Sequence, residues 1–208
     1  DSYLAYASLC GNVLLGNKLI DDDYVIALQR TDNPWNYKKL AFRTPAPPKE
    51  WIASQSYRPV FNPKDSTIWV DLLWSGHLFV LDFKGRLIDS VPIVADDRIP
   101  PGLAKSRIKS KAVWREWESR WTPTTTLRYA EPGYLFLQFR TGWRKIANDS
   151  IPLFSTLTWR SDRHPIKLEI DHRWQLAGVQ PDGRIIFGHY DVSDDAAKVV
   201  LNIMRINP

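Results

Sequence analysis

This sequence of 208 residues contains one cysteine and one methionine, and the scarcity of each excludes some classes of protein. The lone Cys10 excludes a disulfide framework, a disulfide-linked partner and a zinc site built from several thiolates. No apolar run approaches the roughly 18 consecutive residues that identify a transmembrane helix. The one methionine is Met204 and the chain begins at Asp1, so we expect a processed product, which favours export to the periplasm or the cell exterior.

Motifs for common catalytic and metal chemistry are missing as well. The sequence contains no GxSxG, GxxxxGK[ST], GxGxxG or HExxH. His77, His164, His172 and His189 are scattered, with no pair at helical spacing, so structural or solvent-facing roles are expected. The run Asp21-Asp22-Asp23 lacks the oxygen spacing of a calcium loop and indicates a hairpin turn. We therefore expect no catalytic residue, no metal and no cofactor.

What the chain has in quantity is apolar and aromatic residues, at 44% and 12% of the total, which excludes a disordered chain. The apolar residues form short runs, rich in β-branched and aromatic side chains and bounded by turn residues, as is typical of strands. The clearest unit consists of four such runs joined by tight turns: Tyr57–Phe61, Thr67–Leu72, His77–Asp82 and Leu87–Val91. This pattern predicts one antiparallel sheet built as a meander.

The same pattern recurs along the chain, at a spacing of very roughly 50 residues. A second unit is predicted from Thr125–Tyr129, Tyr134–Phe139, Leu153–Trp159 and Ile166–Ile170, a third from Trp174–Val179, Arg184–Tyr190 and Val199–Arg205, and a less regular one at the start from Val13–Ile20, Tyr24–Gln29 and Lys39–Arg43. Radial repetition of four-stranded sheets is the signature of a β-propeller. The sequence thus predicts an all-β propeller with about four visible blades in a single domain, residues 1–208.

Two stretches carry a family resemblance. The stretch LFVLDFKGRLIDSV (Leu78–Val91) resembles a blade of NHL-type and six-bladed TolB-like propellers, and LAGVQPDGRIIFGHY (Leu176–Tyr190) is similar to the first two strands of such a blade. The resemblance implies a ring of blades, and 208 residues are too few for six of this length. The chain is accordingly expected to form either a small ring or part of a larger one.

The opening run, Tyr3–Leu9, is strand-like and has two possible partners. In propellers the N-terminal segment often supplies the strand that the last blade lacks, which removes an exposed sheet edge. Alternatively, the run pairs locally within the first unit. Both possibilities are open at the level of sequence.

The strand pattern is interrupted at about residues 98–122, where one helix is predicted. Pro100 and Pro101 precede it and Pro123 follows it, which suits the first position and the end of a helix. Between Leu103 and Trp121 there are six basic and two acidic residues, a net charge of +4, whereas the rest of the chain carries 22 basic and 21 acidic residues, a net charge of +1. Nearly all of the basic character therefore lies in this one segment.

Three roles are open for the predicted helix: packing on the propeller with a solvated charged face, docking of a protein partner, or attachment to an anionic membrane surface. Its two glutamates argue against nucleic acid. Because tryptophan and arginine are enriched at interface hot spots, we expect a protein partner. The candidate partner-binding residues are Lys105, Lys109, Lys111, Trp114, Arg115, Trp117 and Trp121.

The resulting prediction is a non-catalytic binding or assembly module that docks a partner through its loops and this helix. Two alternatives remain. One is a lactonase-type propeller hydrolase that uses a calcium ion, which the resemblance makes possible. The other is a carbohydrate-binding module, in which tryptophans in or beside turns stack on sugar rings. Those tryptophans are Trp35, Trp51, Trp143, Trp159 and Trp174.

Overall fold

In a computed structural model of the chain, two compact units are present, the first containing the described residues up to Val94 and the second those from Thr122 onward. The structure describes residues 5–20, 23–42, 57–72, 76–94, 122, 124–130, 133–146, 149–160, 165–180, 182–193 and 196–205. Every element in these ranges is a β-strand. No helix in the part of the chain that is described is long and apolar enough to span a membrane.

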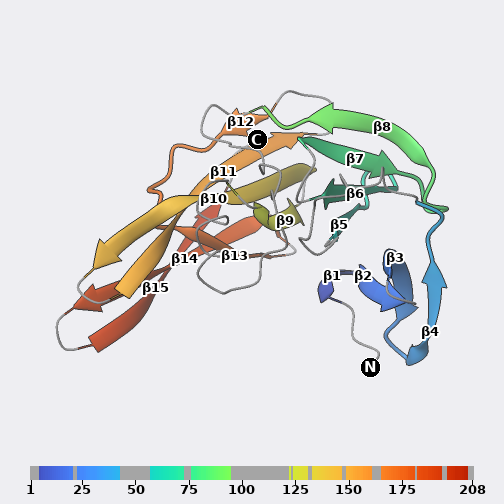
Figure 1. Cartoon of the computed structure of the whole chain (residues 1–208), viewed down its shortest axis with the longest axis horizontal. Helices are drawn as coiled ribbons and strands as arrows, with labels where there is room; N and C mark the ends of the chain where they lie inside the picture. Colours follow the sequence, from blue (N-terminus) through green and yellow to red (C-terminus); the bar gives the residue numbers. More distant parts are fainter. Residues whose placement is uncertain are drawn as a thin grey trace, which may run out of the picture. The chain divides into compact units, whose positions relative to one another are not determined.

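The first unit contains two four-stranded antiparallel sheets (Figure 1). One has the order β1-β2-β3-β4, formed by Ala5–Cys10, Val13–Ile20, Asp23–Arg30 and Asn33–Lys39. The other has the order β5-β6-β7-β8, formed by Tyr57–Asn62, Thr67–Leu72, His77–Leu81 and Leu87–Pro92. Each strand pairs with its neighbour in sequence, as short turns between antiparallel strands require.

The second unit contains one four-stranded and one three-stranded antiparallel sheet. The first has the order β12-β11-β10-β9, formed by Thr124–Ala130 (β9), Tyr134–Ile146 (β10), Asp149–Arg160 (β11) and Ile166–Lys167 (β12). The second has the order β13-β14-β15, formed by Gln175–Val179, Arg184–Ser193 and Ala196–Arg205.

The predicted all-β class and the local meanders are confirmed, and four antiparallel sheets of this kind are propeller-like. The opening run pairs locally: β1 lies against β2, with Cys10 opposite Val13. The predicted strand Lys39–Arg43 is wrong, because the chain turns at once after β3 and its partner is β4, which ends at Lys39. The exposed pair between Arg30 and Asp32, with 2.8 Å from Nε to Oδ1, lies in this turn.

The predicted helical insertion at about 98–122 lies outside the described residues, apart from Thr122. Among the residues that are described, the structure contains no helix, so the fold that it shows is four sheets without the helical element. The seven candidate partner-binding residues belong to that insertion and lie outside the described ranges with it.

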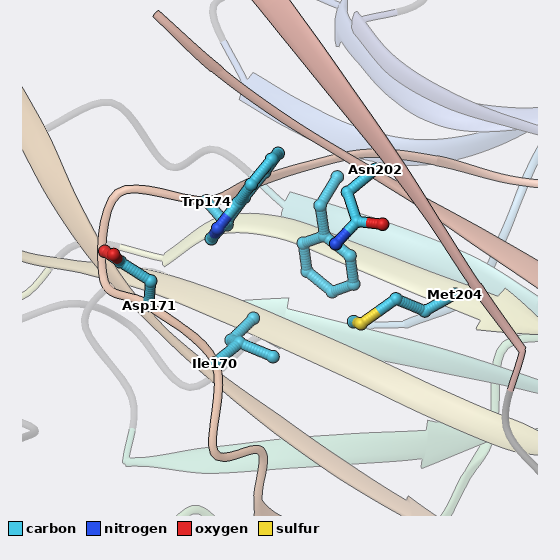
Figure 2. Close-up of a pocket in the computed structure, with 6 residues that line it drawn as sticks. Ile170, Asp171, Trp174, Asn202 and Met204 are labelled. Atoms are coloured by element: carbon cyan, nitrogen blue, oxygen red, sulfur yellow. The ribbon is translucent and has the colours of Figure 1, made fainter. Parts of the chain in front are cut away.

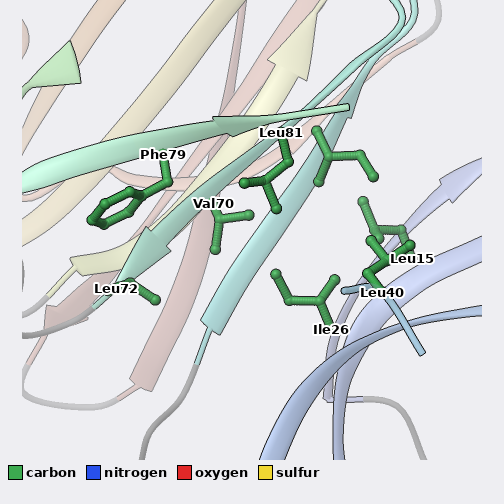
Figure 3. Packing of buried hydrophobic residues seen from close by; sticks show 8 residues of the cluster. Leu15, Ile26, Leu40, Val70, Leu72, Phe79 and Leu81 are labelled. Atoms are coloured by element: carbon green, nitrogen blue, oxygen red, sulfur yellow. The ribbon is translucent and has the colours of Figure 1, made fainter. Parts of the chain in front are cut away.

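The core of the first unit lies between its two sheets (Figure 3). It is formed by Leu15, Ile26, Leu40, Ile68, Val70, Leu72, Phe79 and Leu81, all of which are buried. Ile68, Val70 and Leu72 are spaced two residues apart, so they project from the same face of β6. This period of two is what directs one face of the strand into the core.

The second unit has its own core, in which Phe136 of β10 packs with Leu176, Ile185 and Phe187 of the three-stranded sheet. Leu168, Ile170, Trp174 and Met204 are partly buried against it. A polar group is enclosed beside these residues, since Gln138 of β10 is completely buried. Trp174 and Met204 also line a pocket beside this core.

Candidate functional site

The second unit contains a small pocket of about 180 Å³. It is lined by Ile170, Asp171, Trp174, Phe187, Asn202 and Met204. Figure 2 shows Trp174, Ile170 and Asp171 on one side of the pocket and Asn202 and Met204 on the other. The lining combines one indole ring, one carboxylate and one amide with apolar side chains, as in sites that bind small molecules.

One side of the pocket is a turn, residues 170–174, which is held in place by β11. The backbone N–H of Phe154 donates to the carbonyl oxygen of His172 at 2.6 Å, and His172 Nδ1 lies 2.9 Å from the carbonyl oxygen of Phe154. Because a carbonyl only accepts, Nδ1 is the donor in the second bond. The backbone N–H of Trp174 donates to the carbonyl of Asp171 at 3.0 Å and closes the turn.

The backbone on either side of Gln175 is anchored by the buried amide of Gln138. Gln138 Nε2 donates to the carbonyl oxygen of Trp174 at 3.1 Å and to Thr156 Oγ1 at 2.9 Å. Its Oε1 accepts from the backbone N–H of Leu176 at 2.8 Å. One side chain thus connects β10, β11 and the start of β13, and it holds the residue that carries the indole.

The indole of Trp174 is also braced by His189 of β14. The two ring centroids are 4.3 Å apart and the planes are nearly perpendicular, at 87°. An edge-to-face contact of this kind is favourable and restricts the orientation of the ring. The aromatic wall of the pocket is therefore preformed.

The carboxylate of the pocket is held by Arg173. Arg173 Nη2 lies 2.7 Å from Asp171 Oδ2, and the backbone N–H of Arg173 donates to Oδ1 at 2.9 Å. These hydrogen bonds, the one from the Arg173 side chain first, lower the pKa of Asp171 from 3.8 to about 2. Asp171 is thus an anion at neutral pH, and it is an acceptor of hydrogen bonds with no proton to give.

Of the candidate sugar-stacking tryptophans whose side chains the structure describes, Trp174 lines this pocket, and Trp35 and Trp143 do not. Trp35 in β4 is 79% exposed, and Trp143 in β10 lies under the guanidinium of Arg140, 4.6 Å from ring centroid to Cζ. Trp159 lies in β11, and Trp51 falls outside the described residues.

The pocket as a whole was not predictable from spacing, because its six residues come from three separate segments, at residues 170–174, 187 and 202–204. Asn202 and Met204 alternate on β15, which places both on one face of the strand, but this alternation occurs in every strand and does not by itself indicate a pocket. Within the described ranges, no three His, Cys, Asp or Glu side chains are grouped so that they could hold a metal ion.

No known protein family and no curated protein matches this sequence. In fold, the chain is similar to the crystal structure of a member of the DUF4221 family from Bacteroides vulgatus, with a TM-score of 0.69 and 10% identity over 96% of this chain and 63% of that one. An endo-arabinase from Bacteroides thetaiotaomicron matches less well, with a TM-score of 0.45 and 12% identity over 97% of this chain and 74% of that one.

The likeness to the DUF4221 structure shows a shared fold and nothing further, because the identity is only 10%. The chain spans less than two thirds of the length of that protein. The chemistry of the site must therefore be argued from its own side chains.

Proposed function

We propose that this chain is a non-catalytic binding module on a propeller-like scaffold, with the Trp174 pocket as its ligand site. The observation that carries the proposal is the lining of the pocket, in which an indole, a carboxylate and an amide surround one small volume. A general acid must hold a proton at the working pH, and a carboxyl group with a pKa of about 2 does not. Both oxygens of Asp171 accept hydrogen bonds from Arg173, which fixes the orientation of the carboxylate at the pocket.

The three polar and aromatic groups of the pocket favour a hydroxylated ring compound, of which a monosaccharide is the simplest. The apolar face of a sugar ring stacks on an indole, and its hydroxyl groups donate to a carboxylate and exchange hydrogen bonds with an amide. Trp174, Asp171 and Asn202 supply these groups around one small volume. This observation favours the carbohydrate-binding alternative over the calcium-dependent hydrolase.

Titration with a panel of pentoses and hexoses, followed by tryptophan fluorescence and calorimetry, tests the pocket. We expect one class of sugar to bind and Trp174→Ala to weaken its binding about fivefold or more, because stacking on the ring contributes about 1 kcal/mol or more. Trp35→Ala removes an exposed tryptophan from the other unit and is the matched control. If no sugar binds, or if Trp174→Ala binds as the unmodified chain does, the ligand class is wrong.

We also propose that the basic segment, residues 103–121, docks an acidic surface of a protein partner. Its net charge of +4 and its three tryptophans support this role, since paired charges guide association and aromatic residues anchor it.

We propose further that the chain belongs to the NHL or TolB-like type of propeller. The resemblance of Leu78–Val91 and the meander β5-β6-β7-β8 support this type.

The docking proposal is tested by reversing charge at Lys105, Lys109 and Lys111 together. Proteins retained from the native source by the unmodified chain should be lost, and the loss should match that caused by raising the salt concentration, because exposed charges are screened. The control reverses the exposed Lys38, Lys39 and Lys64 and leaves the basic segment intact. Equal retention by both variants would exclude the segment as the docking element.

A further inference from the structure

The lining of the Trp174 pocket includes one charged side chain, and that side chain is an anion. Among the described residues that line the pocket, Asp171 is charged, Asn202 is polar and uncharged, and the other four are apolar or aromatic. No lysine, arginine or histidine is among them. A ligand in the pocket therefore meets a carboxylate acceptor but no cation in the described lining.

The carboxylate of Asp171 keeps room for a ligand although Arg173 holds it. The backbone N–H of Arg173 donates to Oδ1 at 2.9 Å, Nε donates to Oδ1 at 3.1 Å, and Nη2 donates to Oδ2 at 2.7 Å. An ionised carboxylate accepts up to about four hydrogen bonds, and three N–H groups of Arg173 use most of that capacity. One hydrogen bond from a ligand can still be accepted.

The positive charge of Arg173 compensates this anion only in part. The hydrogen bond from Asp171 raises the pKa of the Arg173 guanidinium most, and the charge of Asp191 on β14 raises it further. The guanidinium thus interacts with two carboxylates, and a single cation cannot neutralise both. It also lies outside the described lining, where Asp171 is the group that a ligand touches.

The cations of β15 lie farther from the pocket. Arg205 is the neighbour of Met204, so it projects from the opposite face of the strand. Lys198 pairs across the ladder with Asp191 and is four residues from Asn202. This separation is about 13 Å along the strand, which exceeds the Debye length of about 8 Å at physiological ionic strength.

The pocket is small enough for the charge of Asp171 to act on any ligand inside it. A sphere with the pocket's volume of about 180 Å³ is roughly 7 Å across, so every part of a bound ring lies within a Debye length of the carboxylate. Like charges repel at this range in every orientation of the ring. A carboxylate that faces another carboxylate also has no hydrogen bond to make.

We propose that Asp171 determines the specificity of the pocket by excluding anions, so that the site takes uncharged sugars and rejects their uronates and phosphate esters. The inference rests on the proposed function and adds the charge class of the ligand. An anionic group that enters the pocket loses its water and gains no cation in return, whereas a hydroxyl or amide group donates to Asp171. Asn202, on the other side of the pocket (Figure 2), both donates and accepts and does not select by charge.

Two series of sugars, each with one ring stereochemistry, test this inference by calorimetry at neutral pH. Xylose, glucose, glucuronamide and glucuronate differ only in the substituent on the fifth carbon, and L-arabinose, galactose, galacturonamide and galacturonate form the second series. In the series that binds, the uronate should bind about fivefold more weakly than the uronamide, or weaker still, because of the repulsion between two anions. The uronamide has the same shape as the uronate and no charge, so it separates charge from size.

Asp171→Asn should abolish this preference. Asparagine forms the same turn as aspartate, so the substitution removes the charge and retains the backbone geometry. Arg173 then loses its nearest carboxylate, and we expect the variant to bind the uronate at least as tightly as the uronamide. Asp182→Asn is the matched control, because Asp182 accepts from the backbone and the side chain of Arg184 at 3.2 and 2.7 Å but does not line the pocket. The control should keep the preference of the unmodified chain.

Equal binding of uronate and uronamide by the unmodified chain would overturn the inference. So would an Asp171→Asn variant that still rejects the uronate. In both cases the uncharged sugars remain bound, and the proposed function stands. If no uncharged sugar of either series binds, the sugar-binding function fails, and the inference fails with it.

Discussion

Replacement of Gly85 by alanine is expected to lower the free energy of unfolding by about 3 kcal/mol or more, although it adds a single methyl group. Gly85 has a φ of +82°, a region that residues with a Cβ enter at a cost. A Cβ there would lie 2.6 Å from the backbone nitrogen of Ala41 and 2.9 Å from that of Phe42. Backbone atoms cannot rotate away, so the turn or the facing segment has to move.

The segment that faces Gly85, at Ala41 and Phe42, is attached to the core of the first unit. The loss in free energy of unfolding therefore includes displacement of core residues as well as strain in the turn. The carbonyl oxygen of Lys84 accepts from the backbone N–H of Ala41 at 3.2 Å, and the neighbouring Leu40 is 1% exposed within the core of the first unit. The turn itself is rigid, because Asp82 Oδ1 accepts from the backbone N–H of Lys84 at 2.8 Å and of Arg86 at 2.9 Å. Movement of either segment would therefore break hydrogen bonds or core packing.

Urea unfolding followed by tryptophan fluorescence measures the effect, and Gly76→Ala is the control. Gly76 precedes β7 and is exposed, and a Cβ added there meets nothing within 4 Å. The control should change stability by less than about 0.5 kcal/mol. A Gly85→Ala variant as stable as the control would mean that the turn and the segment at Leu40 do not make this close contact.

The turn at Gly85 also explains why the sheets could be predicted from the sequence. In several turns an aspartate accepts the backbone N–H two residues later and pairs with an arginine: Asp82 with Arg86, Asp171 with Arg173, and Asp182 with Arg184. Such Asx turns depend on a few adjacent residues, so they are visible in the sequence. The starts of the strands that follow these turns, β8, β13 and β14, were predicted within one residue, whereas β12 ends three residues before the predicted Ile170 and β14 ends three residues after the predicted Tyr190.

Strand length was harder to predict, because it depends on packing. Strand β10 continues to Ile146, well past its predicted end at Phe139. Strand β11 begins at Asp149, before its predicted start at Leu153. The sequence Thr141-Gly142 is typical of a turn, but the structure keeps it in the strand as a register irregularity between Arg140 and Gly142. A glycine in a strand indicates a turn or a bulge equally well, and only the partner strand decides between them.

The pocket was less predictable still, because it depends on contacts between sheets. Trp174 was singled out for its place beside a turn, but Asp171 and Asn202 carried no signal of their own. Gln138 is the clearest case. It is a polar residue within the apolar stretch Tyr134–Phe139, and the sequence contained no indication that a second sheet supplies its partners. Buried polar groups are recognised by their partners, which lie far away in the chain.

Gln138→Met is expected to destabilise the second unit by about 3 kcal/mol while nearly preserving side-chain volume. The substitution removes the bonds to Thr156, Trp174 and Leu176, and it leaves the N–H of Leu176 in the core without an acceptor. The cost of such orphaned buried groups exceeds the net gain from the hydrogen bonds themselves. Since the amide also holds the backbone of Trp174, the near-UV circular dichroism of the indole should change as well.

Gln175→Met is the matched control, because Gln175 is the first residue of β13, next to Leu176, but its side chain is exposed. It should leave both the urea midpoint and the near-UV spectrum unchanged. Thr156→Val, alone and combined with Gln138→Met, measures how far the two side chains act together. The losses in free energy of unfolding should be less than additive, because both substitutions remove the same hydrogen bond. Full additivity would mean that the hydrogen bond between Gln138 and Thr156 contributes nothing to stability. An unchanged near-UV spectrum for Gln138→Met would mean that the amide does not position Trp174.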